Sequence, residues 1–449
     1  MHVIIVGAGE VGWYLADRLC GERHDVVVVE QDEGVAAQIG EELDVQVVVG
    51  NACHPSVLVA AGVERAELLA GVTQSDEVNL IAALAAKQLG AARTVVRIQS
   101  EELRGPAGAD LRSAVGADLV IDPDADTAAE IMAVINLAGA DEVYPMVGGR
   151  LMVLGTAIRE GSDLAGRSLH DIGMSFEPRW EFLFGVITRR GESVIPRGDE
   201  LLQVGDHVRV LTTRDAQRET LTLLGTPARR VRRLMVLGGG AVGSQVAAAM
   251  SGRRTEVVLV ERDVARANLL AAALPRVRVI HGDIADVDLL RDESVATMDV
   301  VVAATGEDTS NVLACAFAAA EGDAFTVAVL HRLALLPLVG RFGIGATLSP
   351  RTASANAVLQ LLRGGAGSVA TFLESDVEVN EFVVGIGSPA DGAVVADMHV
   401  PRRLLLGAVV RSDESVEIVR GPTRLRAGDR VVVFSRARDL GLARGVFDA

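Results

Sequence analysis

The same glycine-rich signature occurs twice in this chain, and that duplication constrains the fold more than any other feature. The first copy follows the apolar residues 3–6 and reads Gly7-Ala8-Gly9-Glu10-Val11-Gly12. The second copy follows the apolar residues 234–237 and reads Gly238-Gly239-Gly240-Ala241-Val242-Gly243. The similarity extends well beyond the glycines, because residues 47–51 resemble 279–283 and residues 73–79 resemble 305–311. The chain therefore contains a duplicated domain.

Each copy of this domain reads as an alternation of apolar strands and helices. In the first copy we predict helices over 11–20 and 75–89, and strands over 2–6, 25–29, 44–49, 67–72, 94–98 and 117–121. The second copy repeats the pattern from residue 233 to about residue 348. Strand–helix alternation with apolar strands predicts an α/β fold, with a Rossmann-like, doubly wound parallel sheet in each copy.

Each copy is followed by an amphipathic helix that starts near a proline, and then by a small strand-rich segment. The helices are predicted over 126–137 and 352–363, and a short basic linker, 226–233, joins the two halves. In each small segment a Gly-Asp turn leads into an apolar strand, 208–211 or 431–434. The predicted boundaries are 1–124 and 231–350 for the Rossmann-like domains, 125–142 and 351–366 for the connecting helices, and 143–227 and 370–449 for the small α+β domains.

Composition excludes several classes of protein. Two uncharged runs, 45–63 and 234–252, contain glycine and polar residues, so we interpret them as strand–loop–helix units and not as membrane spans. No basic segment precedes the first apolar stretch, which argues against a secretory signal. Acidic residues outnumber basic ones by 60 to 43, and this excess argues against nucleic acid as the main partner. Cys20, Cys53 and Cys315 show no paired or metal-ligand spacing, so we expect buried packing in a reducing cytoplasm.

Three glycines of each copy have distinct physical roles, because the motif follows a strand and opens a helix. The first permits a tight turn, the second lets a phosphate approach the backbone, and the third allows close helix–strand packing. They are Gly7, Gly9 and Gly12 in the first copy, and Gly238, Gly240 and Gly243 in the second. Free N–H groups at the start of the helix then bind phosphate. The alternative, that the glycines serve only packing, is stronger for the second copy.

A glutamate ends the second predicted strand of each copy, Glu30 in the first and Glu261 in the second. A carboxylate there accepts hydrogen bonds from ribose hydroxyls and repels a 2′-phosphate, which favours NAD(H) or an adenosine nucleotide over NADP(H). A solvated strand end is the alternative for either residue. Asp32 and Asp263, two residues further on, are predicted helix caps.

Other candidate binding residues lie at the carboxyl edge of the sheet, where open parallel sheets bind ligands. They are Gly50, Asn51, Thr73 and Gln74 in the first copy, and Gly282, Asp283, Thr305 and Gly306 in the second. Arg97 ends the fifth strand and is expected to face a phosphate, whereas its counterpart is the apolar Val329. The two sites are therefore expected to be unequal. Asn79 and Asn311 are either functional residues or helix-packing residues.

The sequence contains no motif of a common catalytic centre. A Ser–His–Asp order, HExxH, a CxxC pair and the P-loop pattern GxxxxGK[ST] are absent, and His54, His281 and His331 are scattered. We therefore expect no catalytic residue and no metal site, and a sensor in preference to an enzyme. A nucleotide-dependent oxidoreductase is the alternative from a different class.

Together these motifs resemble those of the TrkA-type regulatory subunits of bacterial potassium uptake systems, which contain tandem RCK (KTN) units. The likeness covers essentially all 449 residues. It is carried by Gly7–Gly12, Glu30, Gly50–Pro55 and Thr73–Asn79. The chain departs from the usual family pattern at Asn51, Gln74 and Gly306, and the glycine weakens the second site further. The resemblance identifies each small domain as an RCK C-terminal subdomain and each connecting helix as a crossover helix.

The resemblance implies a cytoplasmic protein that is peripherally associated with the inner face of the cell membrane through its partner. That partner would be a membrane-embedded, Trk-type potassium-translocating subunit, beneath which such proteins form a ring, commonly a tetramer. The resemblance also implies that NAD(H) and/or ATP/ADP bind and change the hinge between domains, which gates the pore, with the crossover helices at subunit contacts. A second interpretation is that the chain regulates another cation channel or an antiporter. No residue of the sequence distinguishes that role from the regulation of potassium uptake.

Overall fold

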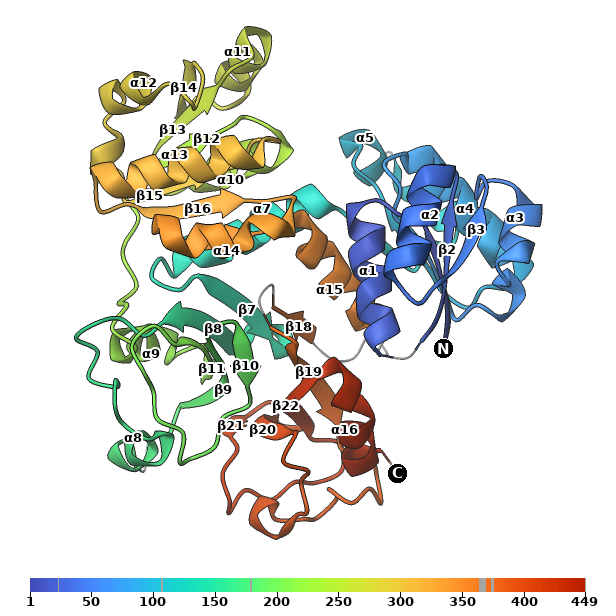
Figure 1. Cartoon of the computed structure of the whole chain (residues 1–449), viewed down its shortest axis with the longest axis vertical. Coiled ribbons are helices and arrows are strands. Elements are labelled where there is room, and N and C mark those ends of the chain that lie inside the picture. The colour runs from blue at the N-terminus through green and yellow to red at the C-terminus, as the bar shows by residue number, and fades with distance from the viewer. Residues whose placement is uncertain (23, 106–107, 178–179, 363–368, 373–374, 449) are drawn as a thin grey trace. The chain divides into compact units, whose positions relative to one another are not determined.

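The computed structural model describes residues 1–22, 24–105, 108–177, 180–362, 369–372 and 375–448 (Figure 1). The chain forms two compact units. The first unit contains Met1–Asp126 and Pro350–Ala366, and the second contains Thr127–Ser349 and Gly367–Ala449. Within the described residues, no helix combines the length and the apolar character that crossing a bilayer requires.

A parallel sheet forms the centre of the first unit. Within the described residues its strand order is β3-β2-β1-β4-β5-β6, and neighbouring strands are parallel. The strands are β1 His2–Val6, β2 Asp25–Glu30, β3 Gln46–Val49, β4 Leu68–Gly71, β5 Thr94–Arg97 and β6 Leu119–Ile121. The central strands β1 and β4 are fully buried, as expected for a sheet covered on both faces. The strand order reverses between β1 and β4, which confirms the predicted doubly wound sheet.

Helices connect these strands and cover the sheet. They are α1 Glu10–Gly21, α2 Glu33–Glu42, α3 Pro55–Ala60, α4 Asp76–Leu89, α5 Glu101–Arg104 and α6 Ala109–Ala114. Asp32 caps α2, because its carboxylate accepts hydrogen bonds from the N–H groups of Gly34 and Val35. Asp263 likewise caps α11 (Val264–Ala273) by accepting from the N–H of Arg266. The predicted capping roles of both aspartates are confirmed.

The two helices that follow the prolines are exchanged between the halves of the sequence. The helix α15 (Pro350–Leu362) comes from the second half, yet it packs against α1 and β6 of the first unit (Figure 1). The helix α7 (Pro123–Asn136) comes from the first half. Its buried Ile131, Val134 and Ile135 belong to a hydrophobic core of the second unit. Each half therefore supplies a helix that covers the Rossmann-like domain of the other half.

Both exchanged helices begin earlier than the sequence analysis placed them. They start at Pro123 and Pro350, two or three residues before the predicted starts at 126 and 352. Proline has the backbone conformation of the first helical turn and lacks the N–H that would be unpaired there, so it begins a helix readily. Residues 363–366 of the predicted connecting helix, and residue 449 of the last predicted domain, lie outside the described residues.

The second unit contains the duplicated parallel sheet. Its order within the described residues, β14-β13-β12-β15-β16-β17, repeats that of the first sheet. The strands are β12 Arg233–Leu237, β13 Glu256–Glu261, β14 Val277–His281, β15 Val300–Ala303, β16 Phe325–Val329 and β17 Ala346–Leu348. The other helices of this domain are α10 Ala241–Ser251, α12 Val287–Asp292, α13 Asp308–Glu321 and α14 Leu336–Val339. The duplication predicted from the sequence therefore extends to strand order.

Two small antiparallel sheets complete the second unit, and they also share one topology. Within the described residues their orders are β7-β8-β11-β9-β10 and β18-β19-β22-β20-β21, with corresponding strands in corresponding places. The first sheet has β7 Glu142–Met146, β8 Leu151–Ala157, β9 Phe182–Arg189, β10 Glu192–Val194 and β11 His207–Thr213. The second has β18 Val369–Thr371, β19 Val377–Val383, β20 Leu405–Val410, β21 Val416–Ile418 and β22 Arg430–Arg436. The accompanying helices are α8 Leu169–Ser175, α9 Gln217–Leu223 and α16 Leu440–Phe447.

A shared core joins the two small sheets, and it includes a buried ion pair. Arg209 is 1% exposed, and its guanidinium donates to both carboxylate oxygens of Glu142 at 2.6 and 2.8 Å. The same guanidinium lies over the ring of Phe372, 4.5 Å from the centroid. Burial opposes the charge, but the Glu142 carboxylate keeps the pKa of Arg209 above its usual value.

The cysteines are only partly buried. Cys315 is buried as predicted, whereas Cys20 and Cys53 are half-buried, so the sequence-based expectation of buried packing was wrong for these two. Both lie near the ends of helices or in turns, where the protein does not enclose a side chain completely.

Candidate functional site

The first glycine loop, residues 7–12, connects β1 to α1. Gly7 has φ +97°, and a Cβ atom there would lie 2.9 Å from Cγ2 of Thr73. A Cβ on Gly12 would lie 1.9 Å from the carbonyl oxygen of Gly7, so this glycine allows α1 to approach the strand. Gly9 is the N-cap of α1, and a Cβ atom added to it would have no neighbouring atom within 4 Å. The loop therefore leaves open space at the one glycine that a phosphate would approach.

The second glycine loop, residues 238–243, repeats this geometry between β12 and α10. Gly238 has φ +104°, and a Cβ on Gly243 would lie 1.9 Å from the carbonyl oxygen of Gly238. Gly240 is the N-cap of α10, and the nearest atom to a Cβ there is 3.8 Å away. Packing thus explains the first and third glycines of each loop, but it does not explain Gly9 or Gly240.

Each predicted ribose-binding glutamate is held beside its glycine loop. Glu30 accepts hydrogen bonds from the backbone N–H groups of Ala8 at 2.8 Å and Gln31 at 2.8 Å. Glu261 accepts from the N–H groups of Gly239 and Asp263, both at 2.8 Å. A carboxylate has about four lone-pair sites, so each glutamate keeps acceptor capacity for ribose hydroxyls. The carboxylates are therefore fixed in place and are not merely solvated strand ends.

Asn79 and Asn311 are structural residues. The Asn79 side chain accepts from the N–H of Thr73 at 2.9 Å and donates to the carbonyl of Arg97 at 3.0 Å. It thereby ties together the carboxyl ends of β4 and β5. Asn311 makes the same contacts with Thr305 and with the carbonyl of Val329. Both asparagines are fully buried, which supports the helix-packing alternative.

Two aspartates that the sequence analysis did not single out brace the same edge. Asp76 at the start of α4 accepts from the N–H groups of Gln99 and Ser100. Asp308 at the start of α13 accepts from those of His331 and Arg332, at 2.9 and 2.7 Å. Burial raises the pKa of Asp308, but the two backbone hydrogen bonds and the interaction with the His331 side chain together outweigh it, and the pKa lies below its usual value. Asp76 and Asp308 are identical between the repeats, within residues 73–79 and 305–311, and that identity is the sequence signal that could have identified them.

The remaining predicted residues lie in turns at this edge. The side chain of Asn51 accepts from the N–H of Cys53, and that of Asp283 accepts from the N–H of Ala285, both closing tight turns. Gln74 is exposed, as is Gly306. Gly50 and Gly282 provide space for side chains of the following helices, since a Cβ there would lie 2.9 and 2.2 Å from Val57 and Leu289.

Arg97 is a half-buried cation at the first site. Its Nε is buried and has no hydrogen-bond partner among the described residues. Burial lowers the pKa of the guanidinium, and nearby carboxylates, including Asp124, Asp76 and Glu10, oppose that shift. At the second site the counterpart Val329 is buried in the core. The predicted inequality of the two sites is visible in these side chains.

A second arginine reaches the first glycine loop from the other half of the sequence. Arg351, near the start of the exchanged helix α15, forms an ion pair with Glu10 at 2.8 Å. Arg351 was not among the predicted binding residues, because its proximity to the loop depends on which domain α15 covers. Its counterpart in the repeat is Asp124, so this contact is another difference between the halves.

A cavity of about 380 Å³ lies at the second site. Its lining contains predicted residues from four strand ends: Gly238, Gly240, Glu261, Asp283, Thr305 and Gly306. It also contains Arg262 and Arg266, which the sequence analysis missed although Arg262 follows Glu261 directly. The Nε of Arg266 donates to the carbonyl of Gly239 at 2.5 Å, across the glycine loop. The predicted residues thus enclose one volume, and a basic side chain lies at its rim.

The architecture is a Rossmann-like domain followed by a small antiparallel domain, occurring twice. Solved structures with this fold include the GsuK RCK domain, with a TM-score of 0.61 and 17% identity over 99% of this chain and 94% of that one. Another is the GsuK channel bound to NAD, with a TM-score of 0.61 and 17% identity over 99% of this chain and 78% of that one. The fold is therefore that of tandem RCK domains.

Sequence comparison then narrows the class to one family. The TrkA-N domain matches residues 3–123 and 234–350, and the TrkA-C domain matches residues 155–225. The Trk system potassium uptake protein TrkA homolog of Archaeoglobus fulgidus is 32% identical over 448 residues, all of both chains. The Trk system potassium uptake protein TrkA of Azorhizobium caulinodans is 30% identical over 453 residues, covering 100% of this chain and 98% of that one. The chain belongs to the TrkA family.

Proposed function

We propose that this chain is a cytoplasmic, nucleotide-binding regulatory subunit that gates a membrane-embedded, Trk-type potassium uptake protein. It senses NAD(H) and/or ATP/ADP, carries out no catalysis, and assembles as a ring, with a tetramer as the expected form. The names of its relatives, which are Trk system potassium uptake proteins, support the choice of potassium transport. A solved RCK channel bound to NAD supports the choice of ligand class.

One observation carries the nucleotide-binding part of this proposal. Gly9 and Gly240 have ordinary backbone angles, φ −67° and −60°, and a Cβ atom would meet no neighbour within 4 Å at Gly9 and only an ordinary contact at 3.8 Å at Gly240. Neither folding nor packing requires glycine there, whereas a phosphate at the start of α1 or α10 does. The carboxylates of Glu30 and Glu261 are held beside the same loops by backbone hydrogen bonds, and they supply acceptors for ribose hydroxyls.

The proposed binding residues fall into two unequal groups. At the first site they are Gly7–Gly12, Glu30, Gly50, Asn51, Thr73, Gln74 and Arg97. At the second site they are Gly238–Gly243, Glu261, Gly282, Asp283, Thr305 and Gly306. Because the Nε of Arg97 has no partner among the residues that the structure describes, the first site is the better candidate for a ligand with additional phosphate charge.

Gating requires that the ligand bind two conformations with different affinity, because equal affinity shifts no equilibrium. The Arg351–Glu10 ion pair supplies a physical route for that difference. A phosphate at Gly9 would lie next to Glu10, and the two anions would compete for the same guanidinium. Ligand binding at the first site would then act on α15, the helix that arrives from the second half of the sequence.

Calorimetric titration with ATP, ADP, NAD+ and NADH tests the proposal. The variants Gly9→Ala and Gly240→Ala each add one methyl group without a steric clash, and the matched controls Gly21→Ala and Gly252→Ala do so at the far ends of the same helices. We expect each loop variant to weaken binding at its own site at least tenfold, and the controls to bind as the wild type does. Unchanged binding in the Gly9→Ala/Gly240→Ala double variant would refute the assignment of these sites.

Potassium flux through a reconstituted Trk-type partner tests the regulatory part. Nucleotide should change the flux in the presence of the wild-type chain and of Gly21→Ala. The response should be lost with Gly9→Ala, while chromatography shows the same oligomer as for the wild type. A nucleotide response that survives in the double variant would exclude the glycine loops as the sensor.

A further inference from the structure

A second cavity of the second unit lies away from both nucleotide sites. It encloses about 240 Å³, and its lining includes none of the residues assigned to those sites. Its walls come from the turn after β8, the linker that follows α9, the amino end of β16 with the preceding helix α13, and glycines that precede β7 and β17. Ligand pockets usually enclose roughly 300–1,000 Å³, so this one suits a molecule smaller than a dinucleotide.

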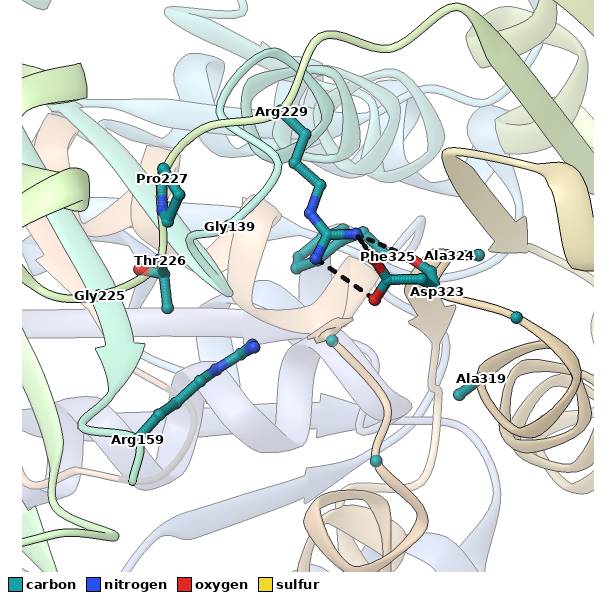
Figure 2. A pocket seen from close by; sticks show the side chains of 13 residues that line it. Gly139, Arg159, Gly225, Thr226, Pro227, Arg229, Ala319, Asp323, Ala324 and Phe325 are labelled. Atoms are coloured by element: carbon teal, nitrogen blue, oxygen red, sulfur yellow. Dashed lines mark hydrogen bonds and ion pairs between the residues drawn. The ribbon is translucent and has the colours of Figure 1, made fainter. Parts of the chain in front are cut away.

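The cavity contains an uncompensated positive charge. Figure 2 shows Arg159 extending from its turn into the open space, with its guanidinium directed toward the pocket. Arg159 makes no ion pair or side-chain hydrogen bond with any residue that the structure describes. Arg159 is exposed, so its guanidinium is accessible to a small anion that enters the cavity.

The other charges in the lining cancel each other. Arg229, from the linker, donates to both the backbone carbonyl and the carboxylate of Asp323, at 2.7 and 2.8 Å (Figure 2). That pairing fixes the Arg229 side chain and neutralises its charge. Among the described residues that line the cavity, Arg159 therefore accounts for the net charge of about +1.

The remaining lining combines apolar side chains with Thr226 and glycine backbone. Phe325, Ala319, Ala324 and Pro227 form apolar walls around the space that Arg159 enters (Figure 2). Gly343 has no atom within 4 Å of a Cβ position, so the backbone is open to a ligand on that side. An apolar body with one anionic group complements this arrangement: the aromatic ring and alanines contact the body, and the guanidinium binds the anion.

We propose that this cavity binds a small organic anion, with Arg159 holding its phosphate or carboxylate group and Phe325 contacting a compact, planar body. The site is separate from the nucleotide sites and does not depend on them. Because the linker residues Thr226–Arg229 form one wall and β16 another, an occupied site would tie the linker to the second Rossmann-like domain. The ligand would thus act as a second effector of this part of the chain.

Titrations of the full-length chain with phenyl phosphate and with benzoate test this site, and benzyl alcohol serves as the uncharged probe. We expect one of the two anions to bind at one site per chain and benzyl alcohol not to bind. Arg159→Gln removes the cation, and Ala319→Leu fills the cavity. Each should weaken anion binding at least tenfold. Arg230→Gln removes an exposed linker arginine that does not line the cavity, and it should change the dissociation constant less than twofold.

The same titrations are repeated in the Gly9→Ala/Gly240→Ala background, so that binding at the glycine loops is not mistaken for binding here. Retention of the anion site in that background is expected even if the chain binds no nucleotide. Preference for phenyl phosphate identifies an organic phosphate as the class of ligand, and preference for benzoate identifies a carboxylate. The proposal is overturned if neither anion binds the wild-type chain, or if Arg159→Gln and Ala319→Leu both bind as the wild type does.

Discussion

Gly12 marks the closest approach of α1 to β1, and its replacement by alanine should destabilise the first unit. The added Cβ would lie 1.9 Å from the carbonyl oxygen of Gly7, whereas ordinary contacts begin at 3.4 Å. Relief of that overlap needs a displacement of about 1.5 Å, the difference between those two distances. The displacement would separate α1 from the sheet against which Val11, Leu15 and Leu19 are buried.

Two opposing contributions set the magnitude. Alanine is favoured over glycine inside a helix by about 1 kcal/mol, which offsets part of the loss. Overpacking of a well-packed site costs about 1–3 kcal/mol and occasionally more, and here the clash is with backbone that cannot rotate away. We therefore expect Gly12→Ala to lower the free energy of unfolding by about 2 kcal/mol. Gly9→Ala, three residues away, meets no atom and should cost less than about 1 kcal/mol through its effect on the helix cap.

Tryptophan fluorescence during urea unfolding measures this difference. The chain has 2 tryptophans, and Trp13 lies in α1, so a Trp180→Phe background makes the signal report on the first unit. Gly12→Ala should shift the midpoint to lower urea, while Gly9→Ala stays close to the parent and Gly21→Ala stays at or above it. A midpoint for Gly12→Ala at or above that of the parent would refute the assigned role of the third glycine.

Three further changes should have measurable effects. Arg97→Met removes a half-buried cation whose Nε has no partner among the described residues. Calorimetry should show nucleotide binding at the first site at least tenfold weaker, and thermal unfolding should show a free energy of unfolding higher by about 1 kcal/mol. Arg209→Met should lose about 3–5 kcal/mol in denaturant unfolding, because Glu142 is left unpaired, and Glu142→Leu in addition should restore most of it. The folded-state pKa of Asp308 lies below its usual value, so its contribution to stability is complete above about pH 5 and is lost as the pH falls through that pKa. Unfolding between pH 3 and 7 should consequently depend less on pH in Asp308→Asn; an identical slope would contradict the assigned hydrogen bonds.

The features that sequence could predict are those fixed by local chemistry. A glycine that follows an apolar strand and precedes a helix has few alternative structures, so both glycine loops and the doubly wound character of both sheets followed from the repeat. The glutamates at the ends of β2 and β13 were predictable for the same reason, because strand ends at the carboxyl edge meet the loop. Capping by Asp32 and Asp263 is likewise a short-range property.

The features that sequence could not predict depend on which surfaces meet. The apolar face of α7 indicates that other apolar residues pack against it. The periodicity of the sequence does not say whether those residues come from the first or the second half of the chain. Arg351 reaches Glu10 only because α15 packs on the first unit, and the position of Arg266 across the second loop depends on a rotamer. The cavity at Arg159 combines five separate segments of the sequence, none of which carries a recognisable motif.

The exchange of crossover helices makes the two halves of the chain interdependent, although the sequence is a tandem repeat. Residues 1–233 expressed alone would lack α15 and would expose Ile131, Val134 and Ile135 of α7, which are at most 1% exposed in the intact chain. Burying each such side chain contributes about 1.5–3 kcal/mol, so the three together amount to roughly 5–9 kcal/mol. That sum is comparable to the whole stability of a typical domain, about 5–15 kcal/mol.

We therefore expect residues 1–233 and residues 234–449, made separately, to aggregate or self-associate with reduced helicity by circular dichroism. Made together in one cell, they should co-purify in a 1:1 ratio and unfold near the temperature of the intact chain, because each half then supplies the helix that the other lacks. A version of 1–233 with Ile131, Val134 and Ile135 replaced by glutamine separates the two effects: it should be more soluble alone and should fail to pair with 234–449. A monodisperse, monomeric 1–233 fragment with native helicity would show instead that the exchange is not needed for folding, and that the ion pair between Arg351 and Glu10 cannot transmit a signal through a required helix.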